Sequence, residues 1–328
     1  MKDLIASNDT ESPARLAADQ GVGQNPRGVI VAANESRFAS TFYSEPLTAY
    51  TVGWRDPENL ETLLETLAPA VPVARRFEYK LADNAQAFLS ESDDVRAIGS
   101  SFKKVEYAGT SANEKTLNKG LTMCVDHDDE VGDGWREMYV GRLMQRLLRN
   151  EVRRATALLL AAATSASKTW NSSANPDGDV RAMRIAGADS TGITGNTIVF
   201  GEAAWELRLD AYEAAANTSS YAGRAAAMTK EQLAAKLGAD RVEVVKARYQ
   251  STATAKANVL GSYVLGYFAV PGVGKDDPSH VKRFVTPTAG GKFRVYVMEH
   301  EKTTDITVEH YSNIVITTST GVRRLAIS

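Results

Sequence analysis

The longest helical pattern of apolar residues runs from about residue 134 to residue 164. Apolar side chains recur there at intervals of three and four residues, as on one face of an α-helix. They are Leu143, Leu147, Leu148, Val152, Ala155, Leu158, Leu159 and Ala162. No proline interrupts the segment, and at 1.5 Å per residue the helix would be about 45 Å long. The pattern predicts a spine helix that supports an elongated subunit.

Before this helix, alternating patterns predict strands. Apolar and charged residues alternate from Phe77 to Leu81, at the two-residue period of β-structure. Residues 102–107 and 121–125 repeat the alternation, and the stretches between them are rich in Ser, Asp, Asn and Lys. Two interpretations remain open. One is the edge of an ordinary sheet, and the other is a long polar β-hairpin that projects from the body and needs a neighbour to pack on.

The first 50 residues contain little apolar sequence that could form a core. Ser12 and Pro13 can begin a short helix, with Ser as its cap and Pro at its first position. Glycines and a run rich in Asn, Ser and Ala follow. We expect this segment to be an arm that becomes ordered by lying on another surface. Asp56 and Pro57 then open a second helix.

The region from 165 to 201 is linker-like because it is rich in Ser, Asn, Asp and Gly, with a short helix from Asn175 to about Gly187. A helix is predicted over 202–216. Thr229 begins a capping box that opens a further helix, which Gly238 closes. The strands predicted in the C-terminal part cover residues 241–247, 262–270, 292–298, 305–311, 314–318 and 322–327. Helices and strands are mixed without a regular βαβ alternation, which favours the α+β class.

Composition is that of an ordinary globular protein. The 328 residues suggest about two domains, and the hydrophobic fraction of 43% and charged fraction of 24% are typical. Cys124 is the only cysteine, which excludes an intramolecular disulfide and a cysteine-based zinc site; its strand pattern predicts a packed side chain. The apolar run 157–163 is too short to span a bilayer, and no apolar signal core follows Met1. We therefore expect a soluble protein made inside the cell.

Candidate catalytic groups are few. The segment Asp126, His127, Asp128, Asp129 and Glu130 could bind Ca²⁺, Mg²⁺ or Mn²⁺ and serve a metal-dependent hydrolase. However, negative charge just before a long helix is also favoured by the helix dipole, and this capping role is the preferred interpretation. No Gly-x-Ser-x-Gly motif is present, and residues 271–275 depart from a phosphate loop at both ends. The sequence predicts no catalytic residue, no cofactor and no metal.

One charge pattern is specific. Arg142, Arg146, Arg149 and Arg153 are four, three and four residues apart, so they share one face of the long helix. A net charge of −2 argues against nucleic-acid binding by the whole surface but permits a local basic stripe. The stripe is either a solvated face or a surface that meets phosphates or the acidic groups of a neighbouring subunit.

The predicted elements occur in the order arm, projecting β-hairpin, spine helix, central α/β part and terminal strands. The segments that carry this order, together with the spine helix, are Tyr50–Pro57, Arg75–Tyr79, Asp94–Gly99, Lys119–Thr122, Val125–Asp126, Asn196–Gly201 and Tyr263–Pro271. In their order and spacing they resemble the major capsid protein of tailed bacteriophages, which has the Hong Kong 97 fold.

The resemblance implies an α+β, Hong Kong 97-like capsid fold. Its segments would be an N-terminal arm (1–50), a helix with an extended β-hairpin or E-loop (51–125), a peripheral domain with the spine helix (126–201), an axial domain (202–279) and returning strands of the peripheral domain (280–328). The hairpin, about Phe77 to Asn118, would lie over an adjacent subunit, and the arm would reach another.

The resemblance also implies a structural function without catalysis. Copies of the chain would self-assemble as hexamers and pentamers into an icosahedral shell that encloses viral double-stranded DNA. An encapsulin-like protein nanocompartment is the alternative, and a metal-dependent hydrolase is a weaker one. The implied partners are other copies, portal, scaffold or decoration proteins, and packaged DNA bound by non-specific electrostatics, with no membrane. The implied location is the virion, after assembly in the cytoplasm of a bacterial host.

Two groups of residues are candidates for contacts in such a shell. The inter-subunit or genome-facing candidates are Arg142, Arg146, Arg149, Arg153, Phe77, Tyr79, Lys103 and Lys104. Some members of the fold cross-link neighbouring subunits through Lys and Asn side chains. Lys103, Lys104, Lys115 and Lys119 are candidates for this only because they lie near the hairpin.

Overall fold

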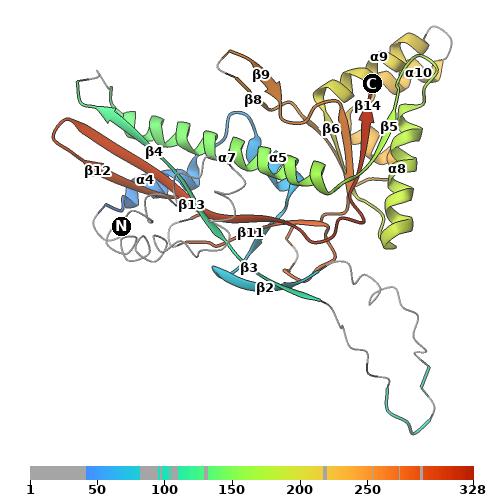
Figure 1. Cartoon of the computed structure of the whole chain (residues 1–328), viewed down its shortest axis with the longest axis horizontal. Coiled ribbons are helices and arrows are strands. Elements are labelled where there is room, and N and C mark those ends of the chain that lie inside the picture. Colours follow the sequence, from blue (N-terminus) through green and yellow to red (C-terminus); the bar gives the residue numbers. More distant parts are fainter. Residues whose placement is uncertain are drawn as a thin grey trace, which may run out of the picture.

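Two β-sheets, with helices packed on them, form the body of the subunit (Figure 1). The computed structural model describes residues 42–81, 95–96, 98–102, 104, 110–128, 132–216, 220–252, 254–272, 274–288 and 291–328. The helices are α4 (Glu45–Gly53), α5 (Leu60–Leu67), α7 (Trp135–Ala162), α8 (Pro176–Thr191), α9 (Glu202–Ala216), α10 (Ser220–Ala226) and α11 (Lys230–Leu237). The strands are β1 (Ala70–Pro72), β2 (Arg76–Lys80), β3 (Ser111–Lys115), β4 (Leu117–Asp126), β5 (Thr164–Lys168), β6 (Thr197–Gly201), β7 (Arg241–Val245), β8 (Arg248–Gln250), β9 (Lys256–Asn258), β10 (Tyr263–Tyr267), β11 (Val281–Val285), β12 (Arg294–Glu299), β13 (Thr303–Ile316) and β14 (Arg323–Ile327).

The first sheet has the strand order β1–β11–β13–β12, and β4 also pairs with β13. The strand β13 is 14 residues long and runs antiparallel to β4 and β12. The sequence predicted two strands here, separated near Ser312 and Asn313, and that prediction was wrong. Both polar side chains have partners on neighbouring elements, because Ser312 donates to the Glu151 carboxylate of α7 and Asn313 donates to the Lys115 carbonyl of β3. Polar residues therefore continue the strand without leaving hydrogen-bonding groups unpaired.

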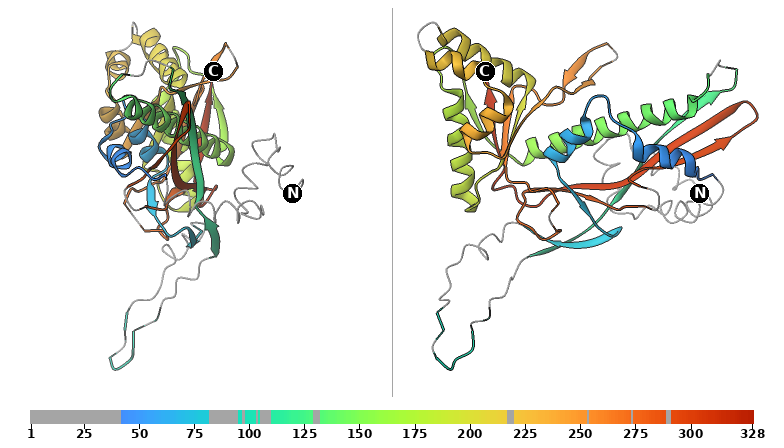
Figure 2. Two further views of the ribbon diagram at one scale, coloured as in Figure 1. Left: turned by 90° about the vertical axis from the view of Figure 1, so that its left-hand side faces the viewer. Right: turned by 180° about the vertical axis from the view of Figure 1, so that it is seen from behind.

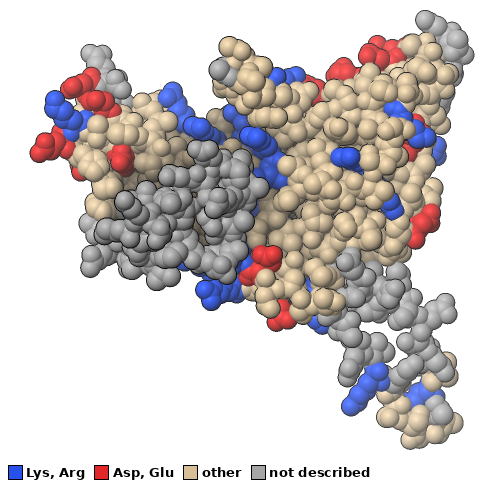
Figure 3. Space-filling view, in the orientation of Figure 1, with Lys and Arg blue, Asp and Glu red and all other residues tan. Residues whose placement is uncertain are grey.

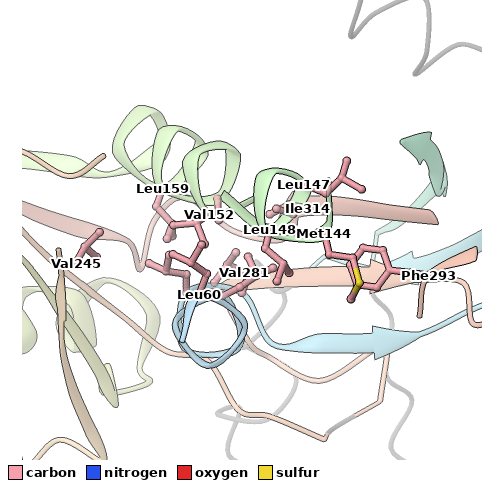
Figure 4. Close-up of a cluster of buried hydrophobic side chains, with 14 of the residues drawn as sticks. Leu60, Met144, Leu147, Leu148, Val152, Leu159, Val245, Val281, Phe293 and Ile314 are labelled. Atoms are coloured by element: carbon pink, nitrogen blue, oxygen red, sulfur yellow. The ribbon is translucent and has the colours of Figure 1, made fainter. Parts of the chain in front are cut away.

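The predicted spine helix is confirmed as α7, which has 28 residues and is about 42 Å long. Its apolar face packs on α5 and on the first sheet. Figure 4 shows Leu148, Val152 and Leu159 of this face in one buried cluster with Leu60 and Val281. Each buried Leu or Val contributes about 1.5–3 kcal/mol relative to an exposed one. This packing fixes the direction of α7, and with it the direction of its opposite, exposed face.

The second sheet has the order β5–β14–β10–β6–β7 and is covered by the helices that follow α7 (Figure 2). It corrects the prediction of a linker-like region over 165–201, because this region contains β5, α8 and the wholly buried β6. The polar residues act locally instead. The Asn175 side chain accepts a hydrogen bond from the Gly178 amide and caps α8, and Gly192, with φ of 71°, ends that helix. The helix is therefore longer than predicted and does not stop near Gly187.

Other local predictions are confirmed. The helix α9 covers the predicted range, and the capping box of Thr229 and Gln232 opens α11, which ends at Gly238 with φ of 66°. Within the predicted arm, α4 was not anticipated, and its Leu47 is buried against the core. The short helix predicted at Ser12 lies outside the described residues. No helix in the described ranges is long and apolar enough to cross a bilayer.

Two hairpins extend from this body (Figure 1). Strand β2 pairs antiparallel with β3, from Arg76–Lys115 to Lys80–Ser111, and forms the base of the predicted long hairpin. Most of the strand predicted over 102–107 lies outside the described residues. The second hairpin, β8–β9, leaves the second sheet beside α7.

Candidate functional site

Aromatic side chains attach the base of the β2–β3 hairpin to the first sheet. The ring centroids of Phe77 and Tyr79 lie 4.3 and 5.1 Å from that of Phe284 on β11. Tyr79 is only 3% exposed, and burial raises its pKa to about 12. These two side chains were candidates for contacts with a neighbour, but in the subunit they pack against their own chain.

Polar contacts also hold the hairpin base in place. The Lys80 amide donates to Asp276 Oδ1 at 2.9 Å, and Lys275 Nζ donates to the Glu78 carbonyl at 2.9 Å. The buried Lys282 in turn donates to the Lys275 carbonyl at 2.7 Å. Lys275, the last residue of the segment 271–275 that partly matches a phosphate loop, therefore links β2 to β11.

Beyond this base, the described residues expose large apolar side chains. Val95 is 82% exposed, Phe102 is 72% exposed, and Ile98 is exposed completely. Lys104 is exposed as well, and Lys103 lies outside the described residues. Large apolar side chains that are exposed in this way can mark interaction sites.

The four arginines of the predicted stripe lie along the ridge of α7 that faces away from the first sheet. Arg142, Arg146 and Arg153 are exposed. Arg149 differs, because its Nη2 pairs with Glu58 Oε1 at 2.6 Å, just before α5. The Arg153 guanidinium lies 4.4 Å from the ring centroid of Tyr249 on β8. Three arginines of the ridge therefore have no carboxylate partner in the described structure. The fourth, Arg149, forms an ion pair within the chain.

A buried charge network that the sequence pattern did not predict lies on the opposite side of α7. Glu151 has a side chain that is 2% exposed, and it accepts hydrogen bonds from Lys119 Nζ of β4 at 2.8 Å and Ser312 Oγ of β13 at 2.9 Å. Arg154 Nη1 donates to the same carboxylate at 2.6 Å, and His310 Nε2 lies 3.9 Å away. The network ties the spine helix to two strands of the first sheet. One feature of the sequence points to this network, because Glu151 is a lone carboxylate within the apolar face of the helix.

Burial and charge act in opposite directions on this network. Burial alone would raise the pKa of Glu151, but His310 and Lys119 hold that pKa well below its usual value. Burial lowers the pKa of Lys119, and Glu151 opposes this effect. Burial also lowers the pKa of His310. Because Lys119 is engaged with Glu151 and buried, it is not accessible as a cross-linking residue in the folded subunit.

A second buried ion pair, also missed, joins the helices on the second sheet. The Arg208 side chain is fully buried, and its Nε donates to Asp177 Oδ1 at 2.8 Å. Lys236 Nζ lies 2.5 Å from the same carboxylate. Three helices, α8, α9 and α11, thus meet at one carboxylate. No periodic signal marks these residues, because each of the three elements contributes only one of them.

The acidic segment begins at Asp126, the last residue of β4, and Gly134 is the N-cap residue of α7. Asp129 lies outside the described residues, so the predicted capping by these carboxylates stays a prediction. Asp126 Oδ1 accepts the Asp128 amide at 3.0 Å, and His127 Nε2 lies 2.7 Å from Thr304 Oγ1. Glu130 lies outside the described residues. Across the described ranges, no three His, Cys, Asp or Glu side chains are grouped so that they could hold a metal ion.

Cys124 is exposed, which corrects the prediction of a packed side chain. It lies on the outer face of β4, next to the buried Val125 on the inner face. A hydrogen bond to Asp305 raises the pKa of its thiol. Since the thiolate is the nucleophilic form, this environment disfavours cysteine chemistry.

A cavity of about 270 Å³ lies between α5, α7 and β11. Its apolar wall includes Leu148 and Phe293. Arg283 and Lys292, which also line it, form ion pairs with Glu65 and Glu61. These charges are therefore compensated within the chain.

The sequence and the structure were each compared with those of known proteins. No protein-family model matches the sequence, and no curated protein matches it. The structure is similar to that of a phage-related protein from Bordetella bronchiseptica, with 16% sequence identity and a TM-score of 0.64 over 87% of this chain and 96% of that chain. Weaker similarities include a capsid chain of the cyanophage P-SCSP1u, at 9% identity and a TM-score of 0.46 over 80% of this chain and 86% of that chain. An encapsulin complex from Synechococcus elongatus matches at 12% identity and a TM-score of 0.43, over 81% of this chain and 87% of that chain.

The α+β class predicted from the sequence is confirmed, and so is the resemblance to the Hong Kong 97 capsid fold.

Proposed function

We propose that the chain is a structural shell subunit, a major capsid protein whose copies assemble as hexamers and pentamers into an icosahedral shell around double-stranded DNA. The observation that carries the proposal is the hairpin. A rigid base of Phe77, Tyr79 and Phe284 supports a segment on which Val95, Ile98 and Phe102 are exposed. The fold similarity supports the same conclusion.

The physical argument concerns where these apolar side chains become buried. A monomer gains nothing from exposed Val, Ile and Phe, whereas burying each against another copy contributes about 1.5–3 kcal/mol. The hairpin and the body surface it would cover are different patches, so the contact is heterologous, and a heterologous contact that closes forms rings. Hexamers and pentamers are such rings. In a finished shell, further partners are portal, scaffold or decoration proteins, and the location is the virion.

The test compares the assembly of two variants of the full chain, one triple variant and one double control. Val95→Ser, Ile98→Ser and Phe102→Ser together remove the exposed apolar side chains of the hairpin. The control, Val52→Ser with Ile185→Ser, removes side chains that are 69% and 60% exposed on α4 and α8. Electron microscopy of the purified proteins should show rings or shells for the wild type and the control but only unassembled, folded subunits for the hairpin variant.

Shells of the hairpin variant at wild-type yield would contradict the proposed use of the hairpin. A wild-type protein that stays monomeric at high concentration under all ionic conditions would contradict the shell itself. The contents of purified shells separate the two kinds of compartment. Co-purifying nucleic acid supports a viral capsid, and a defined enzyme cargo supports an encapsulin.

A further inference from the structure

The outer ridge of α7 carries positive charge that the subunit does not neutralise. Arg142 lies over the Tyr139 ring, 5.3 Å from its centroid, and Arg153 lies over the Tyr249 ring. In the part of the chain that the structure describes, neither has a carboxylate partner, and Arg146 has no ion pair or hydrogen bond. The ridge is thus a row of guanidinium groups that face solvent.

This row is electrostatically unfavourable for the isolated helix. Arg142 and Arg146 are four residues apart, Arg146 and Arg149 three, and Arg149 and Arg153 four. Like charges at these spacings destabilise a helix. Glu58 compensates only Arg149. Because the packing of the opposite face fixes α7 on the sheet, the helix cannot rotate to separate these charges.

The surroundings contain few acidic groups that could relieve this repulsion. Figure 3 shows Lys and Arg side chains gathered over α7 and beside the β8–β9 hairpin, whereas Asp and Glu gather near the β12–β13 turn and over α9 and α10. The overall charge of −2 is therefore distributed unevenly. A local positive surface of this kind attracts a polyanion.

We propose that the ridge of Arg142, Arg146 and Arg153 binds the phosphate backbone of double-stranded DNA. The proposal deepens the proposed function and rests on it, because a shell subunit that encloses DNA needs an inner surface able to contact it. The three side chains extend over about 16 Å of helix, and duplex DNA presents one charge per ~1.7 Å of its axis. A rigid row of arginines therefore meets phosphates in any register, without reading the bases.

The geometry favours a duplex over a lipid surface. An amphipathic helix binds a bilayer by burying its apolar face in it, but the apolar face of α7 is already buried on the first sheet. Only its charged ridge is available. The guanidinium group also matches phosphate with paired hydrogen bonds, which suits Arg better than Lys.

Arg149 has a different function within the same ridge. Its partner Glu58 also accepts a hydrogen bond from Gln145 at 2.9 Å, so the carboxylate fastens the turn before α5 to α7. Arg149 is therefore a structural residue, and the DNA-binding set is smaller than the stripe that the sequence shows.

The test measures binding of the full chain to a short labelled duplex of arbitrary sequence, by fluorescence anisotropy between about 50 and 200 mM salt. The variant is Arg142→Gln, Arg146→Gln and Arg153→Gln. The charge-matched control is Arg181→Gln, Arg224→Gln and Lys302→Gln, which removes three exposed cations from other elements. The ridge variant should make the negative slope of log K against log salt shallower by about 2.7, at 0.9 per lost contact. It should also weaken binding at about 50 mM salt by at least about tenfold. The control and Arg149→Gln should leave the slope unchanged, and circular dichroism should show that all variants are folded.

Equal losses in the ridge variant and the control would overturn the inference, and so would wild-type affinity in the ridge variant. Tighter wild-type binding to phosphatidylserine vesicles than to the duplex would overturn it in favour of a membrane. Assembly that fails in the ridge variant while duplex binding persists would overturn it in favour of an acidic neighbour. Electron microscopy of the same samples reports on the shell separately: duplex binding by a wild type that never forms shells would reject the proposed function but not the ridge.

Discussion

The two sides of α7 handle charge in opposite ways. On the inner side, Glu151 is 2% exposed and meets Lys119, Arg154 and Ser312. On the outer side, Arg142 and Arg146 face solvent without a carboxylate partner among the described residues. The same helix thus carries, on its inner side, a carboxylate that is paired within the chain and, on its outer side, arginines that are not.

The difference shows which charges contribute to folding and which to association. A buried charge without a partner costs several kcal/mol, so the inner carboxylate requires compensation within the chain. An exposed charge stays hydrated and is screened over about 8–10 Å in physiological salt, so the outer arginines need no partner for the subunit to fold. We therefore expect substitutions on the inner side to affect subunit stability and those on the outer side to affect contacts between the subunit and other molecules.

The largest effect is expected for Glu151→Ala. The substitution leaves Lys119 buried without its carboxylate, and breaking a buried pair in this way costs about 3–5 kcal/mol. Urea unfolding of the unassembled subunit, followed by circular dichroism, should show this loss of unfolding free energy. A loss below about 1 kcal/mol would mean that water reaches the network and that the inner side of the helix is not closed.

A double variant tests whether an unpaired charge causes the loss. Glu151→Leu with Lys119→Met replaces both members of the pair with apolar groups, a change that is often close to neutral. Arg154, whose side chain is 48% exposed, can turn to water. The double variant should recover most of the stability that Glu151→Ala loses. A double variant as unstable as the single one would assign the effect to packing.

A smaller effect is expected from acid, through His310. Burial lowers the pKa of His310 in the folded subunit, against its ordinary value of about 6.5 in the unfolded chain. The unfolded chain therefore binds more protons below about pH 6.5, and stability is complete above that pH and falls as pH decreases through it. One proton limits the slope to about 1.4 kcal/mol per pH unit. The groups that face His310 are Glu151 from α7, Lys119 from β4 and Arg283 from β11.

The check is urea unfolding at a series of pH values between about 7 and 5. His310→Gln should flatten the decline in stability over this range. His300→Gln, which removes a half-exposed histidine at the turn between β12 and β13, is the control and should retain the wild-type decline. Identical pH profiles for wild type and His310→Gln would show that another group takes up the proton.

The inner and outer sides of α7 were not equally predictable from the sequence. Periodicity determined the helix, its buried face and the arginine ridge, because all three follow from residue spacing along one element. The pairing of Glu151 with Lys119 and Ser312 could not be predicted, since it depends on which strands pack under the helix. Only the presence of a carboxylate within the apolar face hinted at it.

The errors have a common physical origin. Ser312 and Asn313 looked like a turn, and residues 165–201 looked like a linker, because polar residues and glycine usually mark chain reversals. In the structure, hydrogen bonds to distant elements satisfy the first pair, and pairing with β14, β10 and β7 orders β5 and β6 at the two ends of the second region. Sequence patterns report local preference, whereas these partners are supplied by tertiary structure.

The smallest effects distinguish the arginines of the ridge from one another. Arg149→Gln removes a partly exposed ion pair with Glu58 and should lower the unfolding free energy by at most about 1 kcal/mol. Arg146→Gln removes no partner and relieves two unfavourable Arg–Arg spacings, so stability should stay constant or rise by about 0.2–0.5 kcal/mol per spacing. Both differences should shrink in high salt, because the charges are exposed.

In a Glu58→Gln background, Arg149→Gln should cause no further loss of unfolding free energy. If instead Arg146→Gln destabilised the subunit more than Arg149→Gln does, the free charge on the outer side would be compensated within the chain, and the contrast between the two sides of α7 would not hold.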